Sequence, residues 1–317
     1  MVWFFDNSSI IWLQETFPWL EWFFKIITFL GNGLFYIILL SIAYWIYRKR
    51  EAIIGIYVLL TTAWLNFFLK VLIKKPRPPQ ELRIIEAEGF STPSGHAQGS
   101  TTVYGWIMLQ INKIWSYIVT PLLVILICIS RVYLGVHYVG DVILGGFIGS
   151  FILLGVYFGT PIFLKWFNQK ESWIKILIGE IYAIIVFVAT FIPAYFVEWP
   201  AGDMSNSADI VAVLVALPFI IYVENRWIKM ETEKLHWQSI ILRLIIGLGL
   251  TLGSYFGLSY LFDLIGELSY SLAYLVRFTK YFIIIWLIGA GTPFLFANVK
   301  IFSKFRNEKI QKEIPNK

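Results

Sequence analysis

Three short polar segments interrupt a chain whose other residues are mostly apolar. They are Lys70–Pro78 (KVLIKKPRP), Pro93–His96 (PSGH) and Ser130–Asp141 (SRVYLGVHYVGD), and they hold two of the chain's three histidines. Polar and charged side chains are costly in apolar surroundings unless they are paired or used. Residues of these types can support acid, base and nucleophilic chemistry, which the apolar residues around them cannot.

The positive charges of these segments favour an oxyanion ligand. Arg77 and Arg131 offer planar guanidinium groups that match phosphate oxygens, and Lys70 adds a compact charge. In PSGH, Gly95 lets the backbone approach a ligand closely, and Ser94 supplies a hydroxyl donor at the start of a helix. Donors fixed in advance stabilise the charge of a phosphoryl transition state. Because the same cations repel a metal ion, we expect no metal and no cofactor.

The two histidines of these segments have different predicted roles. His137 and Asp141 stand four residues apart, which places them on one face of a helix, one turn apart. Asp141 can hold one imidazole nitrogen while the other attacks phosphorus, so we predict His137 as the nucleophile. His96, from a separate helix, is predicted to protonate the leaving oxygen. The third histidine, His236 in EKLHWQ, is predicted to be an ordinary surface residue.

A purely structural interpretation of these residues is the alternative. Lys and Arg at helix ends commonly extend to lipid headgroups, and a His and an Asp four residues apart are often only a structural pair. The polar residues would then be separate caps of helices at the membrane interface. Three segments that fall on one side of the predicted topology favour a joint site instead.

Composition places the segments in a membrane protein. The chain of 317 residues is 58% hydrophobic, has a mean hydropathy of +0.71 and leaves no room for a sizeable soluble domain. Apolar stretches of about 20 residues, the length that crosses a bilayer as a helix, recur from end to end. We predict an all-α, polytopic transmembrane helix bundle with about nine spans: 26–47, 52–73, 96–113, 115–131, 137–164, 172–196, 207–228, 238–262 and 270–297.

The ends of these spans predict the orientation of the chain. The Trp-rich residues 3–24 lack the basic region of a cleaved signal and are predicted to form an interfacial helix, with a tenth span as the alternative. Lys and Arg mark every second connection and the C-terminal tail as cytoplasmic. The three polar segments then lie on the extracytoplasmic side of the membrane. Residues 74–83 are basic although they face outward, as expected if they hold an anionic ligand.

The spacing of these residues resembles the three-part signature of the type 2 phosphatidate phosphatase superfamily. This superfamily includes lipid phosphate phosphatases, bacterial undecaprenyl-pyrophosphate phosphatases and, more distantly, vanadium haloperoxidases. The resemblance implies a metal-independent phosphohydrolase in which His137 forms a phosphohistidine, Asp141 orients it and His96 protonates the leaving group. The same resemblance implies a location in a bacterial plasma membrane. It also implies five residues that hold the phosphate: Lys70, Arg77, Ser94, Gly95 and Arg131.

The resemblance covers only the first half of the chain. We therefore predict a phosphatase core over residues 1–165 and additional C-terminal transmembrane helices over residues 166–317. Arg277 and Lys280 are unusual inside an apolar run of this second part. We favour a contact with headgroups at a helix end, or a structural pair with Asp263 or Glu267, over a role in lining the site of the lipid.

The predicted function is hydrolysis of a lipid phosphate or pyrophosphate monoester at the extracytoplasmic membrane face. A lipid phosphoryl transferase with the same intermediate is one alternative, and a non-enzymatic lipid-phosphate carrier or interaction protein is another. The expected partner is a membrane lipid phosphate and not a nucleic acid. Because the signature contacts only the phosphate, the choice of lipid, any protein partner and the oligomeric state are left open.

Overall fold

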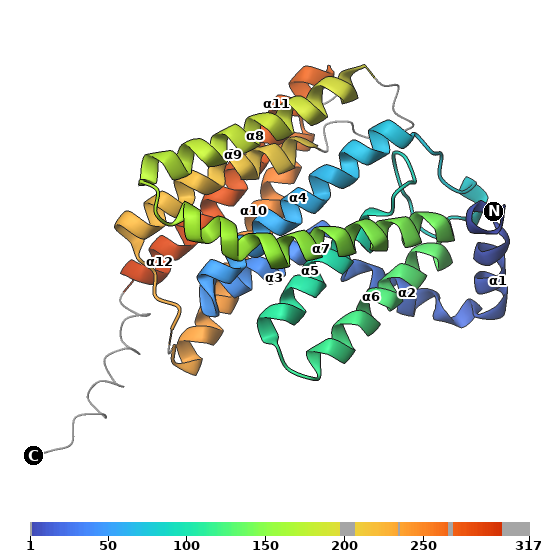
Figure 1. Cartoon of the computed structure of the whole chain (residues 1–317), viewed down its shortest axis with the longest axis horizontal. Coiled ribbons are helices and arrows are strands. Elements are labelled where there is room, and N and C mark those ends of the chain that lie inside the picture. Colours follow the sequence, from blue (N-terminus) through green and yellow to red (C-terminus); the bar gives the residue numbers. More distant parts are fainter. Residues whose placement is uncertain (1, 197–206, 234, 266–268, 300–317) are drawn as a thin grey trace, which may run out of the picture. The chain divides into compact units, whose positions relative to one another are not determined.

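The computed structural model describes residues 2–196, 207–233, 235–265 and 269–299 (Figure 1). All regular elements in these ranges are helices, which confirms the predicted all-α fold. The α-helices are α1 Ser8–Thr16, α2 Glu21–Phe29, α3 Gly33–Ile46, α4 Lys49–Ile73, α5 Gly95–Ile111, α6 Ser116–Tyr133, α7 Val139–Phe167, α8 Ser172–Tyr195, α9 Ser207–Val223, α10 Trp237–Asp263, α11 Tyr270–Trp286 and α12 Thr292–Asn298. Short 3-10 and π-helical turns are η1 Val2–Phe5, η2 Pro18–Leu20, η3 Gln80–Leu82, η5 Glu224–Ile228 and η6 Leu287–Gly291.

Seven helices within these ranges are long and apolar enough to cross a membrane, or eight if the bent pair of α2 and α3 makes one span. The predicted number of nine is therefore not confirmed. Two predicted spans account for the difference. The span over 96–113 corresponds to α5, which has only 17 residues, and the span over 26–47 is broken, with its two parts bent by 48°.

The break between α2 and α3 has a local cause. Gly31 and Gly33 are poor helix formers, and Asn32 starts a new helix because its Oδ1 accepts the backbone N–H of Leu34 at 2.9 Å. The residues before the break form short helices and not one long span. Trp12, Trp19 and Trp22 are exposed on them, as expected of an interfacial segment, and their place relative to a membrane stays a prediction.

The chain forms two compact units. The first consists of Met1–Tyr36, Gly55–Lys170 and Val186–Ser207, and the second of Ile37–Ile54, Glu171–Ile185 and Ala208–Lys317. All three polar segments belong to the first unit. The predicted division at residue 165 stays a prediction.

In the first unit, α5 and α7 pack closely because α7 carries glycines beside the backbone of α5. A Cβ atom would lie 2.6 Å from the carbonyl oxygen of Ser94 if added at Gly145, and 2.6 Å from that of Gln98 if added at Gly149. The hydroxyl of Thr102 also donates to the carbonyl oxygen of Gly149 at 3.2 Å. This packing sets the first turn of α5 beside the first turns of α7, where the predicted site residues lie.

The second unit is held by polar contacts at helix irregularities. The π-helical turn η6 leaves carbonyl groups free, and those of Ile288 and Gly289 accept from Trp45 Nε1 at 3.1 Å and from the hydroxyl of Tyr44 at 3.2 Å. Lys49 forms an ion pair of 2.5 Å with the buried carboxylate of Glu224. These contacts join helices of the second unit to one another.

Arg277 forms an ion pair within the second unit. Its Nη2 lies 3.5 Å from Oδ2 of Asp209 on α9, so the ion pair joins α9 to α11. The acidic side chains predicted as partners, Asp263 and Glu267, lie outside the described side chains. Sequence proximity favoured those two residues, whereas packing of two helices selects a residue almost 70 positions away.

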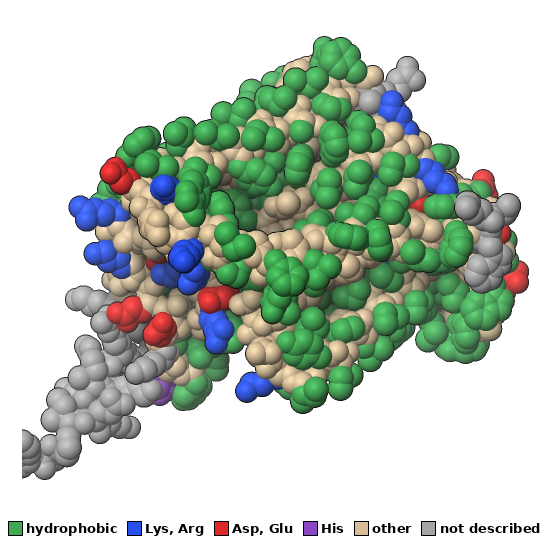
Figure 2. Space-filling model, viewed as in Figure 1, with side chains coloured by type: hydrophobic (Ala, Val, Ile, Leu, Met, Phe, Trp, Pro, Cys, Tyr) green, Lys and Arg blue, Asp and Glu red, His purple; other side chains and the backbone are tan. Residues whose placement is uncertain are grey.

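Hydrophobic side chains cover most of the face in view in Figure 2. Along α7, five large hydrophobic side chains are each more than half exposed: Ile143, Phe147, Phe151, Leu154 and Phe158. A surface of this kind is suited to contact lipid chains and not water. The chain is an integral membrane protein.

Candidate active site

The three polar segments meet in the first unit through backbone hydrogen bonds. The N–H of Ser91 donates to the carbonyl oxygen of Lys75 at 2.8 Å, which ties the loop before α5 to the end of α4. The N–H of Ser94 donates to the carbonyl oxygen of Asp141 at 3.0 Å, which ties the same loop to α7. The segments therefore converge as the sequence predicted.

A tight turn after α6 brings His137 to this junction. Gly135 has a φ of 71°, a conformation that residues with a side chain rarely adopt, and an added Cβ would overlap the carbonyl oxygen of Leu82. The neighbouring carbonyl oxygen of Leu134 accepts the N–H of Ile84 at 3.1 Å. The turn thus fixes the segment before His137 against the loop of residues 79–90.

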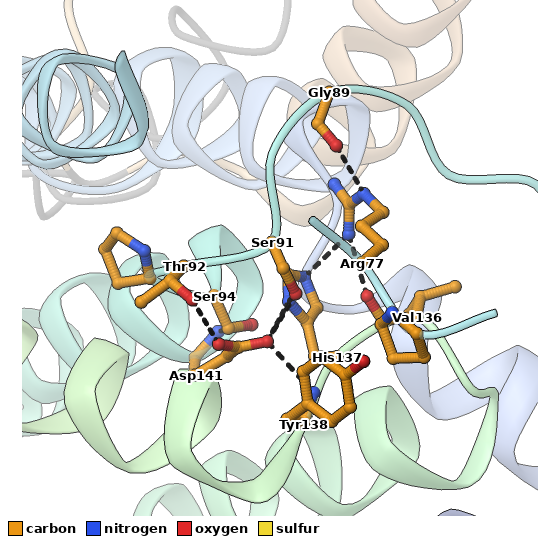
Figure 3. Close-up of polar contacts among 12 residues, drawn as sticks. Arg77, Gly89, Ser91, Thr92, Ser94, Val136, His137, Tyr138 and Asp141 are labelled. Atoms are coloured by element: carbon orange, nitrogen blue, oxygen red, sulfur yellow. Dashed lines mark hydrogen bonds and ion pairs between the residues drawn. The ribbon is translucent and has the colours of Figure 1, made fainter. Parts of the chain in front are cut away.

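His137 and Asp141 face each other without a close hydrogen bond. Nδ1 of His137 lies 3.5 Å from Oδ2 of Asp141, and both side chains are almost completely buried. The hydroxyl of Ser91 lies between them: it donates to Oδ2 of Asp141, and its oxygen is 3.3 Å from Nδ1 of His137 (Figure 3). Ser91 is therefore a bridge between the imidazole and the carboxylate.

Two further donors hold the carboxylate of Asp141. The hydroxyl of Thr92 donates to Oδ1, and the backbone N–H of Tyr138 donates to Oδ2 at 2.9 Å. A buried carboxylate with three donors is well compensated and keeps one orientation. Sequence reasoning missed Ser91 and Thr92, although both stand directly before PSGH and could have been noted as a pair of hydroxyl residues.

Arg77 defines the other side of the imidazole. Its Nη1 lies 3.2 Å from Nε2 of His137 and donates to the carbonyl oxygen of Val136 at 2.9 Å (Figure 3). Its Nε donates to the carbonyl oxygens of Glu88 and Gly89, at 3.0 and 3.1 Å. A guanidinium group only donates, so Nε2 is the acceptor of this contact and the proton of the neutral imidazole is on Nδ1.

Positive charge surrounds His137. Burial first, and then the charges of Arg77, Arg131 and Lys70, hold the pKa of His137 well below its ordinary value. The imidazole is therefore neutral near pH 7. Its Nε2 carries no proton and keeps an electron pair that can attack phosphorus. These are the charge state and the tautomer that a nucleophile needs.

Arg131 is the most enclosed of the three cations. Only 6% of it is exposed, and its Nη1 donates to the hydroxyl of Thr28 on α2 at 2.6 Å. Its buried Nε has no hydrogen-bond partner. A buried guanidinium N–H without a partner is costly unless a ligand completes it, which suits an oxyanion site.

The PSGH segment lies at the start of α5. The hydroxyl of Ser94 accepts the N–H of Ala97 at 3.4 Å, so in this structure it caps the helix. Gly95 lies against Asn66, whose Oδ1 would be 3.0 Å from an added Cβ. His96 is partly buried, and burial first, then the charge of Arg131, holds the pKa of His96 well below its ordinary value. The predicted acid and nucleophile thus belong to one cluster.

Metal coordination has no evident ligand set in the described part of the chain. No three side chains of His, Cys, Asp or Glu are grouped there as ligands of one ion. The residues that do gather, three cations around a neutral imidazole, fit an anion better than a cation.

Comparison with known proteins gives consistent matches in both halves of the chain. Residues 51–165 match the PAP2 superfamily, and residues 208–304 match the transmembrane extension of PAP2 superfamily phosphatases. Phosphatidylglycerophosphatase B of Bacillus subtilis is 34% identical over 166 residues, which are 48% of this chain and 81% of that protein. Sphingosine-1-phosphate phosphatase 1 of Rattus norvegicus is 30% identical over 174 residues, 50% of this chain but only 39% of that protein.

One solved structure is also similar. It is the crystal structure of a transmembrane PAP2-type phosphatidylglycerolphosphate phosphatase from Bacillus subtilis, which is 31% identical. The similarity covers 45% of this chain and 78% of that chain, with a TM-score of 0.42.

Proposed function

Because the chain belongs to the PAP2 superfamily and is a phosphatase of that family, we propose that it hydrolyses a lipid phosphate through a phosphohistidine at His137. The observation that supports this most directly is the pair of contacts of the imidazole. Arg77 donates to Nε2, while Ser91 and Asp141 lie on the side of Nδ1. The nucleophilic nitrogen is thereby kept unprotonated and directed toward the cations.

In the first step, Nε2 of His137 attacks phosphorus, and the bond from phosphorus to the lipid oxygen breaks. The phosphate takes the place of the contact between Arg77 and Nε2, so that the guanidinium donates to a phosphate oxygen. Lys70 and Arg131 stabilise the remaining negative charge of the transition state. Burial and the neighbouring cations lower the pKa of His96 in the empty site, and bound phosphate offsets those cations, so His96 is protonated in the complex. It gives this proton to the departing alkoxide, which leaves as an alcohol.

In the second step, water attacks the phosphohistidine, and His96 accepts the proton of that water. The bond from Nε2 to phosphorus breaks and inorganic phosphate leaves. While the intermediate exists, the imidazole carries a positive charge with its proton on Nδ1. Asp141 balances this charge through the hydroxyl of Ser91, which accepts from Nδ1 and donates to the carboxylate.

The similar proteins support a lipid phosphate monoester as the substrate class, since their names refer to phosphatidylglycerol phosphate and sphingosine-1-phosphate. Phosphate release from phosphatidylglycerol phosphate, phosphatidate, sphingosine-1-phosphate and undecaprenyl pyrophosphate, measured with purified protein and EDTA, tests this. We expect activity on at least one monoester in the presence of EDTA. Transfer of the phosphoryl group to an added lipid acceptor in preference to water would favour a transferase, and no turnover of any substrate would favour a carrier.

The intermediate can be tested with a matched pair of histidine variants. His137→Ala should lose turnover on every substrate, whereas His236→Ala, which removes a histidine of the other unit, should keep it. Rapid quenching in alkali with a 32P-labelled substrate should trap label on the wild-type protein and on His236→Ala only. Label that survives acid, as on serine, would contradict the proposal.

The two catalytic histidines should differ in their dependence on the leaving group. General acid catalysis is worth roughly 10²- to 10⁴-fold when an alkoxide leaves and far less when p-nitrophenolate leaves. His96→Ala should therefore lose most activity on the lipid phosphate but retain more on p-nitrophenyl phosphate. His137→Ala should be inactive on both. Equal losses on both substrates in both variants would remove the basis for these two roles.

The proposal also places the site on the extracytoplasmic face. It is supported by individual helices of the first unit: α5 and α7 begin at the site and end near Lys113 and Lys165, basic ends that favour the cytoplasm. In a Cys128→Ser background, Glu86→Cys should react with a membrane-impermeant maleimide in intact cells, and Lys170→Cys only after the membrane is opened. The reverse pattern would place the site in the cytoplasm.

A further inference from the structure

The break between α2 and α3 lies against the candidate active site. The break lies within residues 27–33, whose sequence is ITFLGNG. These residues belong to none of the three polar segments described above. Thr28 and Gly31, one turn apart, contact two residues of the site, Arg131 and His96. The contacts come from opposite ends of a four-residue segment, Thr28–Gly31, which we call the elbow.

Gly31 makes room for the imidazole of His96. A Cβ added at Gly31 would lie 2.9 Å from Cδ2 of His96 and 2.9 Å from Cγ2 of Ile127, closer than Cβ atoms approach other heavy atoms. The side chain of Ile127 is completely buried, so it cannot yield easily. Any side chain at residue 31 would therefore displace the ring of His96. Residue 31 is therefore a glycine because the imidazole of His96 occupies the space that a side chain would need.

Thr28 and Leu30 tie the elbow to the two helices that carry the contacted residues. The hydroxyl of Thr28 accepts from Nη1 of Arg131 on α6 at 2.6 Å. The carbonyl oxygen of Leu30 accepts a hydrogen bond of 2.7 Å from the hydroxyl of Tyr104. Tyr104 lies on α5, the helix that also carries His96. The elbow thus has one bond to each helix and cannot move without changing the geometry of the site.

We propose that the elbow is a fourth part of the active site, which positions the general acid His96 and the phosphate-binding Arg131. Gly31 acts through His96: it lets the imidazole lie where it can protonate the leaving oxygen. Thr28 acts through Arg131: it holds one N–H of the guanidinium, so that the others point to the phosphate. The roles of His96 and Arg131 rest on the proposed function, whereas their contacts with the elbow do not.

The test for Gly31 uses a glycine two residues away as its control. An added Cβ at Gly33 would meet nothing within 4 Å, so Gly33→Ala should keep wild-type activity. Gly31→Ala should behave like a weaker His96→Ala, because a shift of about 1 Å in a catalytic group costs up to roughly 10²-fold. We expect its loss on a lipid phosphate to exceed its loss on p-nitrophenyl phosphate by roughly tenfold or more. A simple loss of folding would lower both activities equally.

Thr28 provides a second, independent measurement. Thr28→Val removes the acceptor of Arg131 while keeping the shape of the side chain, and Thr28→Ser restores the hydroxyl. Thr28→Val should weaken inhibition by vanadate, an analogue of the transition state, by roughly tenfold, and Thr28→Ser should bind vanadate like the wild type. Unchanged vanadate binding in Thr28→Val would overturn this half of the proposal.

Failure of the elbow can be told apart from failure of the catalytic mechanism. If His96→Ala depends on the leaving group and a folded Gly31→Ala does not, the elbow proposal is wrong and the acid role of His96 stands. If the activity loss in His96→Ala does not depend on the leaving group, the proposed acid role of His96 is wrong, whatever Gly31→Ala shows. If Gly31→Ala does not fold, as judged by its melting curve beside Gly33→Ala, the vanadate result for Thr28→Val decides.

Discussion

The bridge formed by Ser91 leads to a quantitative prediction for Ser91→Ala. The hydroxyl connects Nδ1 of His137 to Oδ2 of Asp141, which are 3.5 Å apart and too distant for a good direct hydrogen bond. The variant leaves the imidazole proton without its acceptor and removes one donor from a buried carboxylate. A hydrogen bond to a charged group is worth roughly 1.5–3 kcal/mol, which corresponds to a loss of roughly 10- to 150-fold in kcat if the transition state depends on it.

Thr92→Val is the matched control for this prediction. Thr92 also donates to Asp141, through Oδ1, but it does not contact the imidazole. Thr92→Val should therefore lower kcat much less than Ser91→Ala, while KM should change little in both variants because the phosphate-binding cations are intact. Ser91→Thr keeps a hydroxyl and should recover part of the activity.

Nuclear magnetic resonance of the ring nitrogens separates positioning from a general loss of structure. The chain has three histidines, so 15N-histidine labelling gives few signals, and the tautomer of each ring can be read from its nitrogen shifts. His137 should carry its proton on Nδ1 in the wild type and in Thr92→Val. In Ser91→Ala a fraction should carry it on Nε2. A wild-type ring protonated on Nε2, or full activity in Ser91→Ala, would refute this reasoning.

Two further predictions concern charge and packing. Since burial and three cations lower the pKa of His137, its ring signals should not change through pH 6.5 and should change only well below it; Arg77→Gln removes one cation and should raise that pKa. A ring that titrates at its ordinary pH would contradict the charge arrangement. Gly149→Ala forces a Cβ against α5 and should lower the melting temperature by several degrees through roughly 1–3 kcal/mol of overpacking, while Gly155→Ala, with open space around it, should not. Equal melting temperatures in the two variants would contradict the close packing of α5 and α7.

The sequence predicted the parts of the site that depend on residue type. Lys70, Arg77 and Arg131 have few uses together in an apolar chain other than to bind an anion, and His137 and Asp141 have a helical spacing. These features need no knowledge of the fold. The cluster of polar segments could therefore be predicted before its geometry was known.

The residues that sequence reasoning missed all act through neighbours that are distant in the chain. A hydroxyl such as that of Ser91 or Thr28 has many structural uses, and only the folded contacts show that it meets His137 or Arg131. Gly31 is required because the imidazole ring of His96 lies directly beside it, and no local sequence pattern predicts this contact. The break in the predicted span over 26–47 was missed for a related reason, because the few residues that break a helix hardly change the mean hydropathy of the window.

The charges of the site explain why these particular polar residues can persist in an apolar protein. The guanidinium groups of Arg77 and Arg131, with Lys70 beside them, outweigh the one carboxylate among the residues of the site, Asp141, so the cluster keeps an excess of positive charge beside a neutral His137. A phosphate monoester near neutral pH carries about −1.5 to −2 charges, so under the proposed function the bound substrate would compensate this excess. A phosphate bound there would also give the unpartnered Nε of Arg131 an acceptor. In the proposed function, part of the binding energy of the substrate therefore comes from completing a cluster that the fold leaves incomplete.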